Sequence, residues 1–353
     1  MVARYKYILY VLPVIVAVLL VAILLGLFLK PESSYLGPKI VIDHDGGADD
    51  AIAILIALIN EKYFSGPNVV ALTTVHGNVN ESQVFINSQR ILDVADRSDV
   101  PIYRGSAEPL ISGIMSDFYF GFDGLGDNEI ETFKRTEAQL EHAALGLIEL
   151  SKKYSGELTI VAIGALTNIA LAIRLDPEFI QRLAHLYIGA GHIYSERFNK
   201  PEFNAAMDVE AYEIALSDST PDDVTLLPFS QVLQDLDIDK NWRTDVLGAI
   251  PNNIVRSLNA FERVSLQSSA NWSLLDPAVM AIVLEKSIVD ETKCSLNSII
   301  LCDEYRGINT NNFTSETPNS EVVYKLNKEN YKKFLLEIFS APENNVKASQ
   351  ETA

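Results

Sequence analysis

The segment KIVIDHDGGADDAIAILIAL holds four carboxylates within eight residues, namely those of Asp43, Asp45, Asp49 and Asp50. Asp43 and Asp45 are two residues apart on a predicted strand, so their side chains point to the same side. Asp49 and Asp50 open a predicted helix, whose dipole favours negative charge. Carboxylates this crowded raise one another's pKa unless protons or a cation intervene, and Ca²⁺ and Mg²⁺ prefer oxygen ligands. The segment therefore predicts a divalent-cation site. The alternative, in which Asp49 and Asp50 only cap the helix and Asp43 and Asp45 are solvated turn residues, is less favoured.

Strands that alternate with helices must position this cluster. A β-branched run at 39–42 leads into the turn at 43–47 and a helix at 49–60, and the same order recurs, with further strands expected at 69–75, 158–163, 186–188 and 224–227. The pattern predicts an α/β fold, a Rossmann-like open, mostly parallel β-sheet flanked by helices. Ligands bind beyond the carboxyl ends of such strands, which is where the acidic turn lies. A last amphipathic helix is expected at 325–339.

The N-terminus has the pattern of a membrane segment. The run at 8–29 is 22 uncharged, apolar residues, and about 20 such residues cross a bilayer. We expect residues 1–30 to be an uncleaved signal anchor, which makes this a single-pass membrane protein with an extracellular or lumenal domain; a cleaved signal peptide and a secreted protein are the alternative. A linker at 31–38 then precedes one domain at 39–340, and a polar tail follows at 341–353.

Net charge, glycosylation motifs and cysteines indicate which classes of partner and which cellular compartment suit the chain. Lys and Arg total 28 against 47 Asp and Glu, and the resulting net charge of −19 disfavours nucleic acid as a partner. Three N-x-Ser/Thr sequons, at Asn80, Asn271 and Asn312, agree with export and glycosylation. Cys294 and Cys302 flank a β-rich stretch, and they either pair across a hairpin in an oxidising compartment or stay two separate buried thiols.

Several motifs together resemble those of one enzyme family. The acidic segment at 43–51 has the pattern Asp-x-Asp-x-Gly-x-Asp-Asp-Ala, and five further matches follow in order at 74–78, 122–127, 163–168, 202–204 and 276–277. The set is similar to the nucleoside hydrolase family, the inosine–uridine preferring type and its relatives. The residues at 242–243 and 246–248 look most like those of animal members.

The resemblance implies a Ca²⁺-dependent ribonucleoside hydrolase, an N-glycosidase that acts as a homo-oligomer and releases ribose and a free base. Asp45 would hold the catalytic water and act as the base. The metal would be bound by Asp45, Asp50, Asp276 and the backbone carbonyl of Ile163. Ribose hydroxyls would be bound by four side chains, those of Asp49, Asn78, Glu202 and Asn204, with Asp43 supporting the site from within. This agrees with the chemistry, because glycosidic cleavage needs an activated water and stabilisation of positive charge on ribose.

The leaving-group half of the site departs from the family pattern. Leu275 and Phe120 stand where family members carry histidines that protonate the departing base. Purines can be protonated on the ring while still attached, whereas uridine is the harder leaving group, so we expect a purine preference. Candidates for stacking on the base are four aromatic residues, Phe118, Tyr119, Phe120 and Trp272. His44 and His76 lie at strand ends, and for both we expect a structural hydrogen-bonding role.

Two alternatives remain open from the sequence. The missing imidazoles also suit a nucleoside-binding ectodomain with weak or no turnover. The Asp-x-Asp-Gly pattern at 43–46 also occurs in haloacid-dehalogenase-type phosphatases, which use an aspartyl nucleophile, although the later motifs of that family are not evident.

Overall fold

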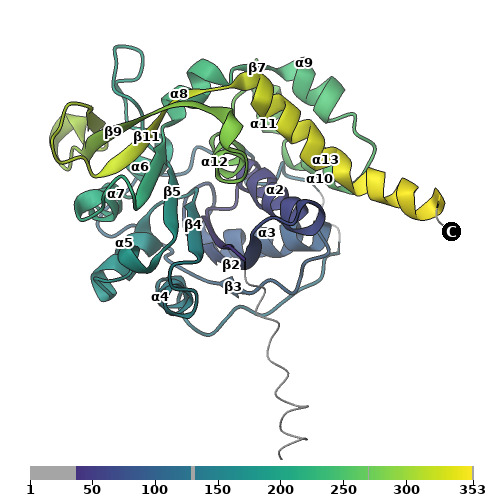
Figure 1. Cartoon of the computed structure of the whole chain (residues 1–353), viewed down its shortest axis with the longest axis horizontal. Helices are drawn as coiled ribbons and strands as arrows, with labels where there is room; N and C mark the ends of the chain where they lie inside the picture. The colour runs from purple at the N-terminus through teal and green to yellow at the C-terminus, as the bar shows by residue number, and fades with distance from the viewer. Residues whose placement is uncertain (1–36, 129–131, 269, 352–353) are drawn as a thin grey trace, which may run out of the picture. The chain divides into compact units, whose positions relative to one another are not determined.

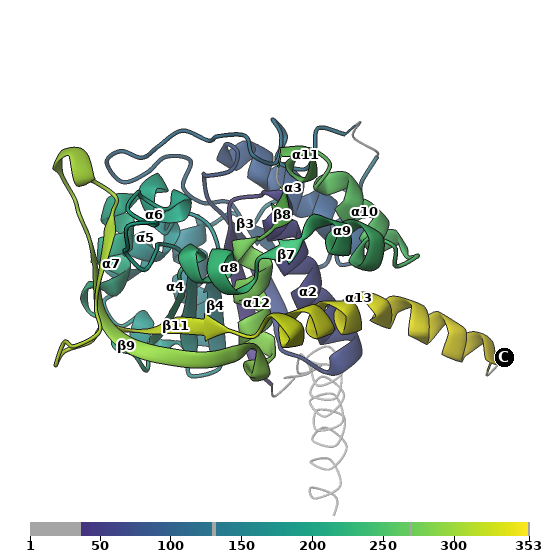
Figure 2. The same cartoon turned by 90° about the horizontal axis from the view of Figure 1, so that it is seen from above.

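A nine-stranded sheet runs through the part of the chain that the computed structural model describes, residues 37–128, 132–268 and 270–351. Its strands are β1 (Lys39–His44), β2 (Asn68–Thr74), β3 (Ile102–Tyr103), β4 (Leu158–Ala162), β5 (His185–Gly189), β6 (Val224–Leu227), β9 (Val289–Ile299), β10 (Asn309–Asn312) and β11 (Ser320–Leu326). They follow the order β10-β9-β11-β6-β5-β4-β1-β2-β3. All neighbours from β3 to β11 are parallel, while β9 runs antiparallel to both β10 and β11, which form one edge of the sheet (Figure 2).

Helices cover both faces of this sheet, because the buried strands are apolar on both sides. In β1, Ile40 and Ile42 pack into one core cluster while Val41 packs into the other. The first cluster is covered by α2 (Ala48–Phe64), α3 (Glu81–Val94), α10 (Asn253–Phe261), α12 (Leu275–Leu284) and α13 (Lys328–Glu351). The second is covered by α4 (Ala143–Lys153), α5 (Thr167–Leu175) and α7 (Val209–Ser217) (Figure 1). This architecture confirms the predicted mostly parallel α/β fold.

Shorter elements complete the described domain. They are α6 (Phe203–Met207), α8 (Phe229–Asp235), α9 (Lys240–Trp242), α11 (Ser265–Ser268), the turns η1 (Ile180–Arg182), η2 (Arg243–Leu247), η3 (Lys286–Ile288) and η4 (Asp303–Tyr305), and the antiparallel pair β7 (Ile238–Asp239) and β8 (Asn271–Trp272).

Two sequence-based expectations near the C-terminus are wrong in detail. Residues up to Leu326 belong to β11, which pairs with β6 and β9, so the last helix begins at Lys328 rather than 325. That helix continues to Glu351, through most of the segment expected as a polar tail. The hairpin across which Cys294 and Cys302 could pair is not found in this described region, because the intervening residues are largely the single strand β9. Both thiols are free, as in the other alternative, but they are exposed where that alternative placed them in the interior.

The chain falls into two units, Met1–Gly37 and Pro38–Ala353, and every element above belongs to the second. The expected anchor at 8–29 lies outside the described residues and stays a prediction. Within the residues that the structure does describe, no helix is both long enough and apolar enough to cross a membrane.

The strand order places a binding site. The order β3-β2-β1-β4-β5-β6 reverses direction between β1 and β4. In open α/β sheets, ligands bind in the crevice beyond the carboxyl ends of the strands at such a reversal. The turn after β1 carries the acidic segment, so the topology brings it to this crevice.

Candidate active site

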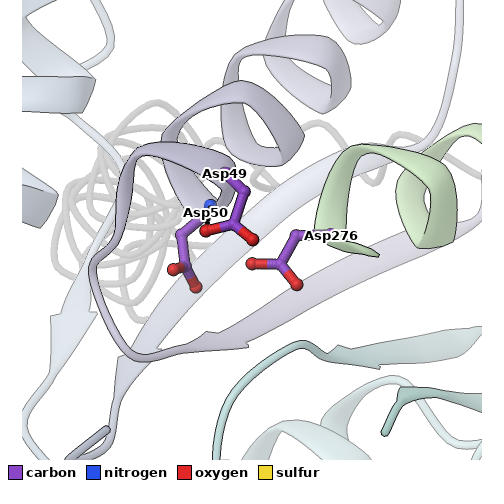
Figure 3. A group of neighbouring side chains, drawn as sticks. All are labelled: Asp49, Asp50 and Asp276. Atoms are coloured by element: carbon purple, nitrogen blue, oxygen red, sulfur yellow. Dashed lines mark hydrogen bonds between the residues drawn. The ribbon is translucent and has the colours of Figure 1, made fainter. Parts of the chain in front are cut away.

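Three carboxylates from two helices meet at this crevice. Asp49 and Asp50 come from the first turn of α2 and Asp276 from the first turn of α12, and one oxygen of each lies within 4.8 Å of the others (Figure 3). All three residues are buried. Burial raises the pKa of each carboxyl well above its usual range, and repulsion from the neighbouring carboxylates raises it further. The group is therefore costly to ionise without a cation.

Backbone donors in the turn fix the Asp50 carboxylate. Its two oxygens accept hydrogen bonds from the amides of Gly47, at 2.7 Å, and Asp45, at 3.1 Å. Gly46 has a φ of +81°, a conformation that L-residues rarely adopt, and this lets the chain turn back onto the start of α2. Asp50 thus caps its own helix and also belongs to the carboxylate cluster.

Asp45 lies beside the cluster and is held by the next strand's loop. Its two oxygens accept hydrogen bonds from the backbone amide and side-chain amide of Asn78, both at 2.8 Å. A Cβ on Gly77 would sit 1.9 Å from an Asp45 oxygen, so only glycine lets the loop approach this closely. The tight cluster contains Asp49 where the sequence pointed to Asp45, so the observed grouping differs from the expected metal set in one member.

Asp43 lies beneath these residues, away from the pocket lining. It is fully buried and accepts hydrogen bonds from the Thr73 hydroxyl, at 2.5 Å, and from the Asn168 amide, at 2.8 Å. Burial raises the pKa of Asp43 to about 7. Asn168 also donates to the Thr74 carbonyl, so it ties the ends of β1 and β2 together. This placement agrees with a supporting role for Asp43.

The opposite wall comes from the start of α6. Glu202 caps this helix by accepting from the amides of Asn204 and Ala205, and it also accepts from Gly191 at 2.8 Å. Burial raises the pKa of Glu202 to about 7. The Asn204 amide donates to the carbonyl of Ile163, at 3.2 Å, which brings that carbonyl into the site wall.

The donor set fits a hard divalent cation. One buried oxygen of Asp276 has no hydrogen-bond partner, although buried carboxylate oxygens are nearly always paired. The nearby imidazole of His44 does not supply positive charge: its Nδ1 lies 3.9 Å from Asp50, and burial lowers the pKa of His44 to about 3. Closely spaced carboxylate oxygens are the ligands that Ca²⁺ prefers.

A pocket of about 510 Å³ opens above the cluster. Its metal-proximal end is lined by Asp49, Asn78, Ile163, Glu202, Asn204 and Asp276, which are six of the nine predicted site residues. Asp43, Asp45 and Asp50 lie behind this surface. Apolar residues also line this pocket, and they include Leu275 and Phe120, the two positions where histidines were expected.

The aromatic residues near the pocket are only partly those expected. Tyr119 and Phe120 line it, whereas Phe118 is exposed outside it. Trp272 is buried elsewhere, because its indole N–H donates to Glu262, at 2.5 Å, and Glu262 is in turn paired with buried Arg243. Sequence reasoning missed Phe229, at the start of α8, which lines the pocket.

The two strand-end histidines are held by internal hydrogen bonds. His44 Nε2 lies 2.9 Å from the Ser88 hydroxyl, and His76 Nε2 lies 3.1 Å from the Thr167 hydroxyl, which donates to Asp208. Neither histidine lines the pocket, in agreement with the structural role expected for them.

Residues 40–333 match the model of the inosine-uridine preferring nucleoside hydrolase family. The chain belongs to this family. The expected kinship with a family of N-glycosidases is thereby confirmed, and the phosphatase alternative is excluded.

Individual nucleoside hydrolases agree with the assignment. Uridine nucleosidase 1 of Arabidopsis thaliana is 36% identical over 193 residues, which cover 54% of this chain and 55% of that protein. A solved plant nucleoside hydrolase has a TM-score of 0.77 and 25% identity, over 86% of this chain and 99% of its own. A solved inosine-guanosine nucleoside hydrolase has a TM-score of 0.75 and 25% identity, over 85% and 98% of the two chains.

The relatives leave one point of the sequence analysis, the likeness to animal members, without support. The chain spans about half the length of the curated relatives it matches. These curated relatives include plant, fungal and protozoan proteins, which do not support an animal-type nucleoside hydrolase.

Proposed function

We propose that this nucleoside hydrolase family member cleaves the N-glycosidic bond of ribonucleosides in a Ca²⁺-dependent reaction, giving ribose and a free base. The observation that carries the proposal is the pocket itself, which combines buried carboxylates with apolar and aromatic lining residues. The carboxylates suit a cation and the ribose hydroxyls. The apolar and aromatic lining residues suit the flat face of a base.

The residues divide the work according to their place in the site. Asp50 and Asp276, with Asp45 and the carbonyl of Ile163, are proposed to hold the metal. Bound Ca²⁺ would lower the pKa of a coordinated water and grip the ribose hydroxyls. Asp45, oriented by its two hydrogen bonds from Asn78, accepts the proton of the attacking water.

Ribose is held by the polar groups that line the metal-proximal end. We assign this role to four side chains, those of Asp49, Asn78, Glu202 and Asn204. The buried carboxylates also stabilise the positive charge that grows on ribose as the glycosidic bond breaks. Free ribose, measured over a nucleoside panel with and without a chelator, tests the proposal.

We further propose a preference for purine nucleosides. Leu275 and Phe120 line the pocket and cannot donate a proton, and His192 does not line it. Burial lowers the pKa of His192 to about 4, so this imidazole is neutral at pH 7. The names of the relatives point both ways, since they include uridine nucleosidases and an inosine-guanosine hydrolase. The kcat/KM for inosine should exceed that for uridine; equal values would refute the preference.

The same two apolar residues favour a second candidate function. A nucleoside-binding ectodomain needs the ribose end of the pocket but no acid for the leaving group. Calorimetry would then show nucleoside binding to a preparation that releases no ribose.

Export, anchoring and assembly are proposals of their own. We propose that residues 8–29 stay as a membrane anchor and that the domain faces the lumen or the outside, where the exposed Asn80, Asn271 and Asn312 are available for glycosylation. Recovery of the protein in the soluble fraction after alkaline carbonate extraction would favour secretion. We also propose a homo-oligomer, which light scattering of the purified protein tests.

A further inference from the structure

The loop between β5 and α6 carries a tight turn at the pocket. Ser195 and Phe198 exchange two backbone hydrogen bonds, of 3.3 and 3.1 Å, and the turn between them consists of Glu196 and Arg197. Arg197 lines the pocket although its neighbour Glu196 does not. This loop is part of the segment HIYSERFNKP, which departs from the family pattern in sequence.

A stack of rings connects this turn to the pocket wall. The guanidinium carbon of Arg197 lies 5.0 Å from the centre of the Phe198 ring, and the Phe198 and His192 ring centres are 5.2 Å apart. His192 in turn stacks on Phe229, with centres 6.2 Å apart and planes 16° from parallel. The Asn309 side chain makes hydrogen bonds with both the backbone amide and the backbone carbonyl of His192, so the position of His192 in the ring stack is fixed. An exposed arginine is therefore held near one place.

The charge of Arg197 is distinctive in its surroundings. Among the described residues that line the pocket, Arg197 is the only one with a positively charged side chain. Five lining residues are acidic, namely Asp49, Asp117, Glu202, Asp237 and Asp276. Its stack ends on Phe229, which does not belong to the ribose-binding set. Arginine keeps its charge throughout the physiological pH range and offers several N–H donors.

We propose that Arg197 stabilises the negative charge on a base that departs before its ring is protonated, a role that rests on the proposed hydrolase function. As the bond between the anomeric carbon and the base nitrogen breaks, its electron pair passes to the base. The water oxygen bonds to the anomeric carbon, and its proton passes to Asp45. The guanidinium donates hydrogen bonds to the anionic base, which then takes a proton from solvent. The cation thereby substitutes for the acid that Leu275 and Phe120 cannot supply.

Two substrates with the same sugar isolate this role. Inosine needs help for its leaving group, whereas para-nitrophenyl riboside releases para-nitrophenolate, an anion that is stable without assistance. The full chain is assayed as wild type and as R197Q, R197K and E196Q, the last being a matched control on the same turn. Loss of a charge-stabilising donor costs about 10²–10³-fold in kcat in a closed site, so an exposed arginine should give about 10–10²-fold.

We expect R197Q to lower kcat for inosine by about that factor while kcat for the aryl riboside changes by less than about threefold. R197K should recover part of the loss, because it keeps the charge without the planar fork. E196Q should leave both substrates unchanged. Equal losses on both substrates, or no loss on inosine, would overturn the role of Arg197. If the wild type releases ribose from neither substrate, the proposed function itself is refuted.

Discussion

Replacing Asp276 by Asn separates two electrostatic effects in the carboxylate cluster, namely the repulsion between the carboxylates and their attraction for Ca²⁺. The substitution keeps the shape of a side chain that is 2% exposed and removes its charge. In the metal-free protein, Asp276 repels Asp49 and Asp50, whose nearest oxygens lie within 4.8 Å. At an effective dielectric constant of about 20, this repulsion is about 3 kcal/mol for each ionised neighbour, and protonation of the cluster reduces it. With one neighbour ionised, metal-free D276N should therefore unfold no more easily than wild type, and up to about 3 kcal/mol less easily.

Calcium should reverse this order. At a Ca²⁺ concentration of about 100 times the wild-type Kd, binding stabilises the folded protein by about 2.7 kcal/mol. If the lost carboxylate weakens binding about 100-fold, or by about 2.7 kcal/mol, the gain for D276N at the same concentration falls to about 0.4 kcal/mol. For a domain of this size, these gains correspond to increases in Tm of about 5 °C for wild type and about 1 °C for the variant.

Scanning calorimetry with a chelator and then with added Ca²⁺ measures both effects. The matched control is Asp237→Asn, which removes an exposed carboxylate that lines the pocket outside the cluster, and it should retain the wild-type Ca²⁺ response. A Ca²⁺-induced shift as large in D276N as in D237N would refute Asp276 as a ligand. A wild-type protein whose Tm does not respond to Ca²⁺ would refute the metal site as a whole.

Three further predictions follow from individual contacts. Asp45→Asn should lower kcat on inosine by at least about 10²-fold, because the water loses its proton acceptor; a variant with wild-type kcat would show that another group is the base. Asn168→Ala removes a buried donor to Asp43 and should destabilise the domain by about 1–3 kcal/mol in urea unfolding; an unchanged midpoint would contradict this. Burial raises the pKa of Glu202 from 4.5 to about 7, so its folded form binds the proton more tightly than the unfolded chain does. The stabilisation of the folded protein by protonated Glu202 is therefore present below pH 4.5 and is lost as the pH rises to about 7. The Tm of the metal-free wild type should fall more steeply than that of Glu202→Gln across this range, and equal slopes would show that Glu202 does not titrate there.

The sequence predicted the location of the site because strand ends determine it. In a parallel sheet the carboxyl ends of the strands lie on one edge, so the polar turns after β1, β2 and β4 had to come together. Motif matches that lie far from these turns in the sequence, such as Glu202-Phe203-Asn204, also line the pocket. Periodicity and turn residues were sufficient to locate the acidic turn, whereas the residues of the opposite wall came from the motif matches.

Side-chain directions within the site were not predictable in the same way. Which aspartates come closest depends on hydrogen bonds made across the fold, such as those from Asn78 to Asp45 and from the turn amides to Asp50. Trp272 has the composition of a stacking residue, but its N–H is bound by buried Glu262. Phe229 lies at a strand-to-helix junction with no motif around it, so no local signal marked it. These outcomes depend on pairings between residues that are distant in sequence.

Release of free ribose from inosine tests the central claim most directly. The full chain is stripped with a chelator, divided, and assayed with and without added Ca²⁺, with Asp45→Asn as the inactive control. The account predicts ribose and hypoxanthine in equal amounts, loss of release after chelation and its return with Ca²⁺. Release that is indifferent to chelation, or inosine binding without ribose above the Asp45→Asn background, would contradict a Ca²⁺-dependent nucleoside hydrolase.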